Sequence, residues 1–234
     1  VDKKTAKETL KNFYKGKIFL PRAFSAENHL EEISGIYVPF WLYSCESNGS
    51  FSFDATRTHH YTDGDYDVTE TEHYLVLRDG EARFNNIPVD GSSKMDDAYM
   101  DAIEPFDYSA ITDFHTDYLP GYAAQTYDED ATACAPRATA RVKNTTIAAI
   151  RRTCDYTTLT PRTSKISTTQ NSVDYALLPV WMLTTNWHGK SYHFAINGQT
   201  GKLIGDLPID KGRFFSLLAG ITIPLGILLK LFIF

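Results

Sequence analysis

The sequence contains few cysteines, no excess of positive charge and no zinc-binding spacing. Cys45, Cys134 and Cys154 are far apart and form no CxxC pair, which excludes a zinc ribbon or a disulfide framework built from these residues. We expect reduced, buried thiols. The formal net charge of −6 argues against the large basic surface that nucleic-acid binding requires. We therefore expect this segment to bind no nucleic acid and no cofactor.

A phosphate-binding loop is also absent. The nearest match, "NGQTGKLIG", places Gly198 and Gly201-Lys202 at the wrong spacing and Leu203 where a hydroxyl should bind magnesium. We interpret it as a turn between strands. The serines of "NGSFS" and "DGSSK" lack the strand, elbow and helix that activate a nucleophile. We assign no catalytic residue, and an enzyme remains only an alternative.

The residues that are present favour a folded, strand-rich protein. The chain has 234 residues, 43% hydrophobic, with fourteen Tyr and fourteen Phe. Apolar periodicity and capping residues predict helices over about 2–15, 25–33, 94–104 and 128–154. The first is capped by Asp2 and ended by Gly16.

Alternating and apolar runs predict strands between these helices. Residues 35–89 are interpreted as four consecutive antiparallel strands, with one turn at Asp63-Gly64 and another at Asp79-Gly80. The runs after residue 155, "YTTLTPRTSKIST", "DYALLPVWMLTTNW", "KSYHFAIN" and "KLIGDLP", predict further strands.

An internal match suggests that the chain has two related halves. Residues 37–55 and 177–195 share Pro-x-Trp at the same place, with Trp41 matching Trp181 and Gly49 matching Gly189. Duplication and chance similarity of aromatic hairpins both explain the match. The predicted fold class is α+β: a helix-plus-antiparallel-sheet half over 1–110, a second over 111–212, and a transmembrane helix over 213–234.

Two groups of polar residues resemble ligand or acid–base sites. His59-His60 lies near Asp63, Asp65 and Asp67, but neighbouring strand residues point to opposite faces, so we predict no metal site. Glu70 and Glu72 share a strand face. A solvated sheet face explains that pair better than acid–base chemistry does.

The end of the chain is almost uniformly apolar. Residues 214–234 carry one charge, Lys230, and about 20 apolar residues cross a bilayer as a helix. We predict a membrane anchor rather than a buried core helix. Lys211 and Arg213 precede it, so the positive-inside rule places residues 1–212 in the cytoplasm at the cell membrane. The predicted lipid-facing residues are Phe214, Phe215, Leu217, Leu218, Ile221, Ile223, Leu225, Ile227, Leu228 and Leu229.

Several motifs together resemble a known family. "ENHLEEISGIYVPFWLY", "DGDYDVTETEHYLV", "LLPVWML" and "FAINGQTGKLIGDLP" are similar to bacterial, mainly Gram-positive, membrane proteins described as containing a transcription-factor-IIB-type zinc ribbon and sometimes labelled primosomal helicase-like. The resemblance implies a zinc ribbon upstream of Val1 and a role in a membrane-stress complex of the phage-shock type. It implies no enzymatic activity.

These observations lead to one expected function and two alternatives. We expect a membrane-anchored cytoplasmic binding or scaffold module whose partners are the lipid bilayer and other membrane-associated proteins. The alternatives are an enzyme with a site between the two halves and a zinc-ribbon-linked nucleic-acid accessory protein.

Overall fold

The computed structural model describes residues 1–25 and 33–233 and divides the chain into two compact units. Unit 1 comprises Val1–Val38, Lys94–Thr126 and Leu177–Phe234, and unit 2 comprises Pro39–Ser93 and Tyr127–Ala176. Neither unit coincides with residues 1–110 or 111–212, because the strands β1 and β4 each run from one unit into the other. The predicted helix over 25–33 lies largely outside the described residues.

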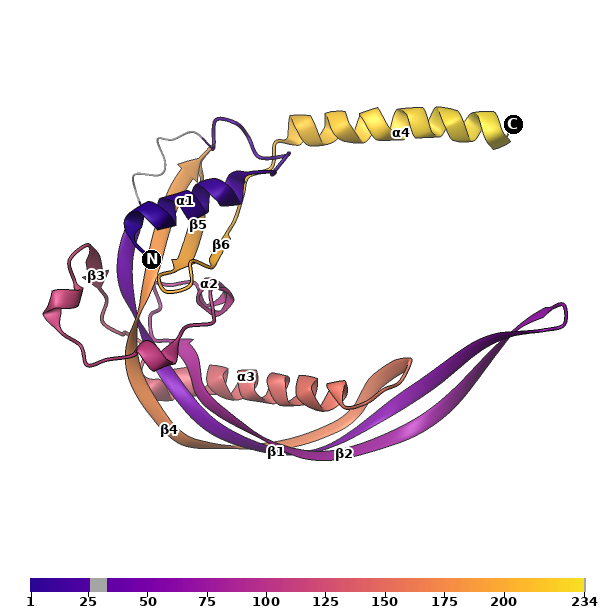
Figure 1. The fold of residues 1–234 in the computed structure, drawn as a ribbon, viewed down its shortest axis with the longest axis horizontal. Coiled ribbons are helices and arrows are strands. Elements are labelled where there is room, and N and C mark those ends of the chain that lie inside the picture. Colours follow the sequence, from indigo (N-terminus) through magenta and orange to yellow (C-terminus); the bar gives the residue numbers. More distant parts are fainter. Residues whose placement is uncertain (26–32, 234) are drawn as a thin grey trace. The chain divides into compact units, whose positions relative to one another are not determined.

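The fold is α+β, as predicted (Figure 1). The helices are α1 (Lys3–Tyr14), α2 (Asp97–Ala102), α3 (Ala131–Arg152) and α4 (Lys211–Ile233), with short 3-10 turns η2 (Tyr108–Ala110) and η3 (Thr116–Tyr118). The strands are β1 (Ser34–Asp63), β2 (Tyr66–Asp90), β3 (Tyr122–Ala124), β4 (Thr158–Trp187), β5 (Lys190–Asn197) and β6 (Leu203–Gly205). The hydrogen-bonded order is β2-β1-β4-β5-β6, and β3 pairs with β1.

The strand count in residues 35–89 was predicted wrongly. The turn at Asp63-Gly64 is confirmed, since Asp63 pairs with Tyr66 and Gly64 has a φ of +60°. No turn forms at Asp79-Gly80, and β1 and β2 are two long strands instead of four short ones. Similarly, the two runs predicted between 156 and 187 form the single strand β4.

Two glycines that resemble turn residues explain this difference. Gly49 and Gly80 are direct partners across β1 and β2. A Cβ added at Gly80 would lie 2.5 Å from Ile150 Cδ1 on α3, and one added at Gly49 would lie 2.6 Å from the ring of Phe51. Glycine leaves room for Ile150 of the helix at position 80 and for the Phe51 ring at position 49, so both glycines lie inside strands.

In unit 2, α3 packs on one face of the sheet formed by β1, β2 and the first part of β4. Cys134, Ala138 and Val142 of α3 meet Tyr43 and Cys45 of β1. Farther along, Ile147 and Ile150 pack beside Phe51, Phe53 and Val76. Pro136 lies in the second turn of α3 and does not end the helix.

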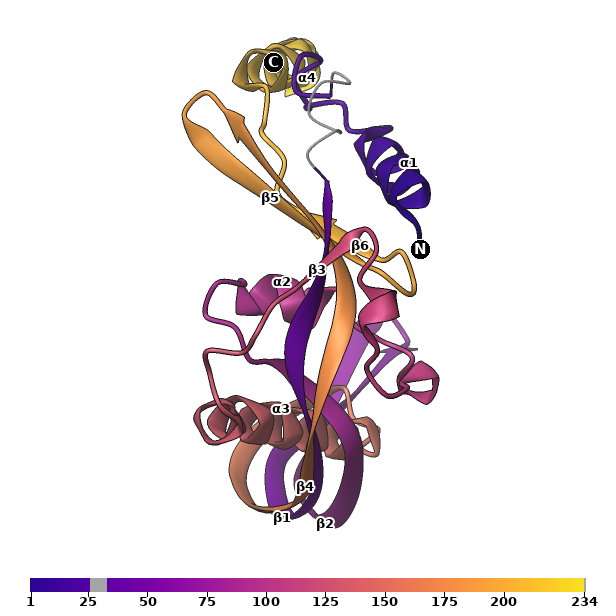
Figure 2. The same ribbon diagram turned by 90° about the vertical axis from the view of Figure 1, so that its left-hand side faces the viewer.

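Unit 1 buries an aromatic core between α1 and the β4–β5 hairpin (Figure 2). Ala6 and Leu10 of α1 are fully buried against Trp181, Phe194 and Ile196. Asp2 caps α1 by accepting a hydrogen bond from the Thr5 amide at 2.8 Å, as the sequence predicts. Leu20 and Phe24, which follow the helix, complete this core.

The matched tryptophans lie in similar but unequal surroundings. Trp181 is 3% exposed in the unit 1 core, whereas Trp41 is half-buried in unit 2. Each lies on a strand that forms a hairpin with the next strand. The matched glycines differ, because Gly49 lies inside β1 and Gly189, with a φ of +74°, forms the β4–β5 turn. Duplication stays a prediction.

Candidate functional site

The most distinctive feature for function is the helix α4. Asp210 caps it by accepting a hydrogen bond from the Arg213 amide at 3.1 Å. The window Lys211–Lys230 spans 20 residues, none of it buried by the described protein. At 1.5 Å per residue it is about 30 Å long, which matches the hydrocarbon thickness of a bilayer. The helix is long and apolar enough to span a membrane.

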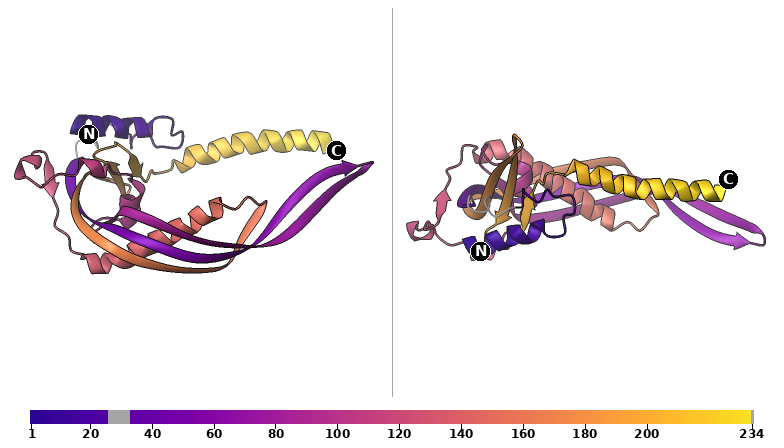
Figure 3. Two further views of the ribbon diagram at one scale, coloured as in Figure 1. Left: turned by 60° about the horizontal axis from the view of Figure 1, so that its bottom comes forward. Right: turned by 90° about the horizontal axis from the view of Figure 1, so that it is seen from above.

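All the residues that we predicted to face lipid are exposed on α4, the yellow helix at the C-terminus in Figure 3. They are Phe214, Phe215, Leu217, Leu218, Ile221, Ile223, Leu225, Ile227, Leu228 and Leu229. Burying each such side chain is worth about 1.5–3 kcal/mol, so leaving them in water would be strongly unfavourable. Within the described residues, α4 is therefore not a buried core helix of unit 1.

The polar groups within α4 are satisfied by the helix itself. Ser216 donates to the Arg213 carbonyl at 3.0 Å, and Thr222 donates to the Leu218 carbonyl at 2.8 Å. In hydrocarbon no water can serve these hydroxyls, so internal partners are needed. Pro224 lies inside the helix without ending it, as membrane-spanning helices tolerate.

A loop after α1 contacts the start of α4, and the sequence analysis did not identify it. The Asp210 amide donates to the Phe19 carbonyl at 2.7 Å, and Arg213 Nη1 donates to the Leu20 carbonyl at 3.3 Å. The rings of Phe19 and Phe214 meet edge to face, 5.5 Å apart. The signal in the sequence is an Ile-Phe pair that follows Lys15, the helix-ending Gly16 and Lys17.

A second exposed feature is the end of the β1–β2 hairpin in unit 2, which we call the arm (Arg57–Glu72). It continues beyond the end of α3 (Figures 1 and 3). Tyr66 is 76% exposed at its tip. The arm carries five carboxylates and one arginine, so it is acidic.

The base of the arm is held firmly. Arg57 Nη2 donates to the Asp155 carbonyl at 3.1 Å, and its guanidinium lies 5.3 Å from the ring centre of Tyr156. The Tyr74 hydroxyl donates to Glu72 at 2.6 Å, and this hydrogen bond raises the pKa of Tyr74. Because β4 begins beside Thr56, the arm is a two-stranded ribbon with both edges open in the described structure.

The arm does not assemble a metal site or a pair of catalytic carboxylates. His59 pairs with Glu70, whereas His60 lies on the other face and shares a 2.9 Å hydrogen bond with Thr69. Among residues 1–25 and 33–233, no cluster of three or more His, Cys, Asp or Glu side chains is arranged to hold a metal ion.

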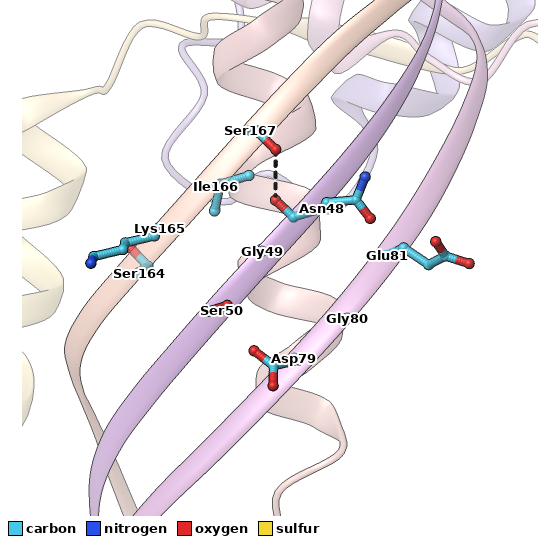
Figure 4. Close-up of a pocket in the computed structure, with 10 residues that line it drawn as sticks. All are labelled: Asn48, Gly49, Ser50, Asp79, Gly80, Glu81, Ser164, Lys165, Ile166 and Ser167. Carbon is cyan, nitrogen blue, oxygen red and sulfur yellow. Dashed lines mark hydrogen bonds between the residues drawn. The ribbon is translucent and has the colours of Figure 1, made fainter.

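A hollow in unit 2 lies over Gly49 and Gly80 (Figure 4). Its polar side chains do not converge: Lys165 on β4 points away from Asp79 and Glu81 on β2. Ser167 donates to the Asn48 carbonyl at 3.4 Å. The hollow therefore offers no aligned acid, base and nucleophile.

The remaining residues considered in the sequence have structural roles. Cys45 and Cys134 are buried between α3 and β1, and burial raises the pKa of the Cys45 thiol. "NGQTGK" forms the β5–β6 turn, as predicted. There the Asn197 side chain accepts hydrogen bonds from the amides of Gln199 and Thr200.

The structure therefore defines an α+β protein with a C-terminal helix that is suited to cross a membrane. The chain is 36% identical over 232 residues to the uncharacterized protein YdjG of Bacillus subtilis (strain 168), covering 99% of this chain and 68% of YdjG. The chain belongs to the YdjG family. No family model and no solved structure matches it.

These comparisons correct the family expected from the sequence motifs. No zinc-ribbon family model matches, and the related protein is described only as uncharacterized. The assignment to a zinc-ribbon family was wrong. The upstream ribbon, the helicase-like label and the membrane-stress role lose their support with it.

Proposed function

We propose that this protein is a membrane-anchored binding module without catalytic activity, and that α4 is its anchor. The observation that carries the proposal is the apolar helix Lys211–Lys230, no part of which is buried by the protein itself. Insertion into hydrocarbon removes that surface from water. Lys230 lies in the last turn, where its side chain extends to the far headgroups.

We further propose that residues 1–212 face the cytoplasm. Lys211 and Arg213 lie at the start of α4, and basic residues next to a membrane span are retained on the cytoplasmic side. A cysteine introduced at Tyr66 tests this, because that position is exposed. A membrane-impermeant maleimide should label Tyr66→Cys only after the cells are lysed. Labelling in intact cells would contradict the orientation.

The arm is the surface that we propose for a protein partner. Its open strand edges present unpaired amides and carbonyls, which an extended segment can join as an additional strand. Its five carboxylates against one arginine favour a basic segment through charge complementarity. We therefore propose that the arm binds a basic, extended segment of a membrane-associated protein.

Membrane washing tests the anchor. The full chain should stay with membranes through carbonate and high salt, because burial in hydrocarbon does not depend on ionic strength. Leu218→Asp/Leu225→Asp should be extracted, since each carboxylate costs about 2.5–3.5 kcal/mol at the centre of a membrane helix. Lys230→Gln is the matched control and should stay bound. Extraction of the unmodified chain by carbonate would refute the anchor.

Peptide binding tests the arm. A soluble peptide of alternating lysine and valine should bind the full chain in detergent and slow hydrogen exchange of the arm amides, whereas a glutamate–valine peptide should not. Neutralising Asp65, Asp67, Glu70 and Glu72 should abolish binding. Neutralising Asp79 and Glu81, which lie on β2 outside the arm, should leave it unchanged. Binding without amide protection would contradict strand addition.

A further inference from the structure

The loop Lys17–Leu20, which we call the contact loop, holds an isoleucine beside the membrane-spanning helix. Ile18 is 64% exposed. It lines an apolar hollow together with Leu217, Gly220 and Ile221 of α4. The side of Ile18 not covered by α4 therefore continues the apolar surface of that helix.

The contact loop is fixed in this position from both ends. Leu20, at its end, is 7% exposed in the core of unit 1. The Asp210 amide donates a hydrogen bond to the Phe19 carbonyl, and the Arg213 side chain donates one to the Leu20 carbonyl. At the other end, Lys17 Nζ lies 5.2 Å from the ring centre of Phe13 on α1. The exposed isoleucine is thus presented by a braced loop.

The position of Ile18 along the axis of α4 determines how deep it would lie in the membrane. Leu217 and Ile221 follow Arg213 by four and eight residues, which corresponds to about 6 and 12 Å of helix rise. If Arg213 lies among the headgroups, a side chain beside Leu217 and Ile221 reaches the depth of about 5–10 Å that interfacial apolar groups occupy.

The charges around the contact loop fit an anionic membrane surface. Residues 15–22, "KGKIFLPR", contain three basic residues and no acidic one, although the whole chain is acidic. Lysines beside exposed apolar side chains are the composition of segments that bind anionic lipid.

We propose that the contact loop is a second, interfacial membrane contact. In it, Ile18 and Phe19 enter the acyl boundary beside α4 while Lys15 and Lys17 face anionic headgroups. This inference rests on the proposed function, because it requires α4 to cross the membrane. Two points of attachment restrict how unit 1 tilts and rotates on the bilayer, which a single helix would leave free.

Spin labels on the full chain in vesicles of phosphatidylcholine and phosphatidylglycerol test the depth. Labels are placed singly at Ile18→Cys, Ile111→Cys and Leu225→Cys, in a Cys154→Ser background. Ile111 is the matched control, because it is an isoleucine of unit 1 and is 45% exposed. Collisions with oxygen, which concentrates in lipid, are compared with collisions with a water-soluble nickel chelate.

The expected result is that the Ile18 label collides often with oxygen and rarely with nickel, and lies shallower than Leu225. A label at Ile18 as open to nickel as that at Ile111, with Leu225 still in lipid, would refute the inference and leave the anchor intact. Access of nickel to both Ile18 and Leu225 would refute the anchor as well. Low collision with both reagents at Ile18 would mean that protein, such as a second copy, covers the loop, which also refutes it.

A separate experiment tests the proposed contact of Lys15 and Lys17 with anionic headgroups. Lys15→Gln/Lys17→Gln should make the Ile18 label shallower in vesicles containing phosphatidylglycerol and leave its depth unchanged in pure phosphatidylcholine. Lys3→Gln/Lys4→Gln, at the far end of α1, is the matched control and should change neither depth. An equal effect of both pairs would overturn the assignment of Lys15 and Lys17 to the headgroups.

Discussion

The side-chain amide of Asn197 makes four hydrogen bonds within unit 1, and its loss should be costly. Asn197 is fully buried. Its Nδ2 donates to the carbonyls of Ile103 and Pro105, each at 3.0 Å, and its Oδ1 accepts from the amides of Gln199 and Thr200 at 2.8 and 3.0 Å. One side chain therefore joins the β5–β6 turn to the segment that follows α2.

Replacing Asn197 with Ala removes these four hydrogen bonds. The turn amides can regain water, but the two carbonyls lie in buried or partly buried positions. A buried polar group left without a partner costs about 1–3 kcal/mol, so Asn197→Ala should lower the free energy of unfolding by about 2–4 kcal/mol.

Asn197→Asp should be worse above acidic pH. It keeps the acceptor for the turn but replaces both donors with an oxygen that faces the carbonyls of Ile103 and Pro105. This raises the pKa of the introduced carboxyl in the folded state. Its pKa in the unfolded chain is about 3.9. Because the pKa is higher in the folded state, the variant is most stable below the unfolded pKa and loses stability as the pH rises through the folded pKa. Stability should therefore fall, relative to the unmodified chain, between acidic and neutral pH.

Urea unfolding in detergent, followed by tryptophan fluorescence, measures both effects. Trp41 is the only tryptophan of unit 2, so a Trp41→Phe background leaves Trp181 and Trp187 to report unit 1. Asn186→Ala is the control, because Asn186 is exposed and accepts one bond from Ser191. It should change stability by under about 0.5 kcal/mol. An Asn197→Asp variant equal to Asn197→Ala at every pH would refute the reasoning.

Three further predictions concern unit 2 and the anchor. Gly80→Ala should destabilise unit 2 by about 1–3 kcal/mol through contact with Ile150 Cδ1. Ile150→Val removes that atom and should recover part of the loss in a double-mutant cycle. Strictly additive changes in the free energy of unfolding would contradict the contact. Asp90→Asn should cost about 1.5–3 kcal/mol in urea unfolding, since buried Asp90 bonds Arg137 at 2.7 Å; an unchanged midpoint would contradict it. Truncation after Gly212 should release a soluble protein whose melting temperature stays within a few degrees, because the unit 1 core contains no α4 residue; aggregation or early melting would contradict the anchor.

The sequence predicted those elements whose causes are local. The cap at Asp2, the turn at Gly64 and the apolar run of α4 each depend on neighbouring residues, and all three are present. Gly49 and Gly80 carry the same local signals as turn residues. Gly80 lies in a strand against Ile150 of α3, and Gly49 pairs with Gly80 across the two strands. Both contacts join residues far apart in the sequence, so periodicity alone could not reveal them.

In the candidate site, too, the sequence predicted only the features that depend on neighbouring residues. The exposed residues of α4 could be named from composition alone, because the apolar run itself identifies a helix long and apolar enough to span a membrane. The contact loop could not, since Ile18 gains its significance from Leu217 and Ile221, which follow it by almost two hundred residues.

The segment order of the two units has a consequence for biosynthesis. Every residue of unit 2 precedes Leu177, whereas unit 1 lacks Phe194 and Ile196 until just before α4 is made. Domains fold as their segments leave the ribosome, so unit 2 can close its core early. Unit 1 completes its core only once β5 has left the ribosome. Until then the apolar face of α1 stays uncovered, so a ribosome stalled before Phe194 should leave unit 1, and not unit 2, open to proteases.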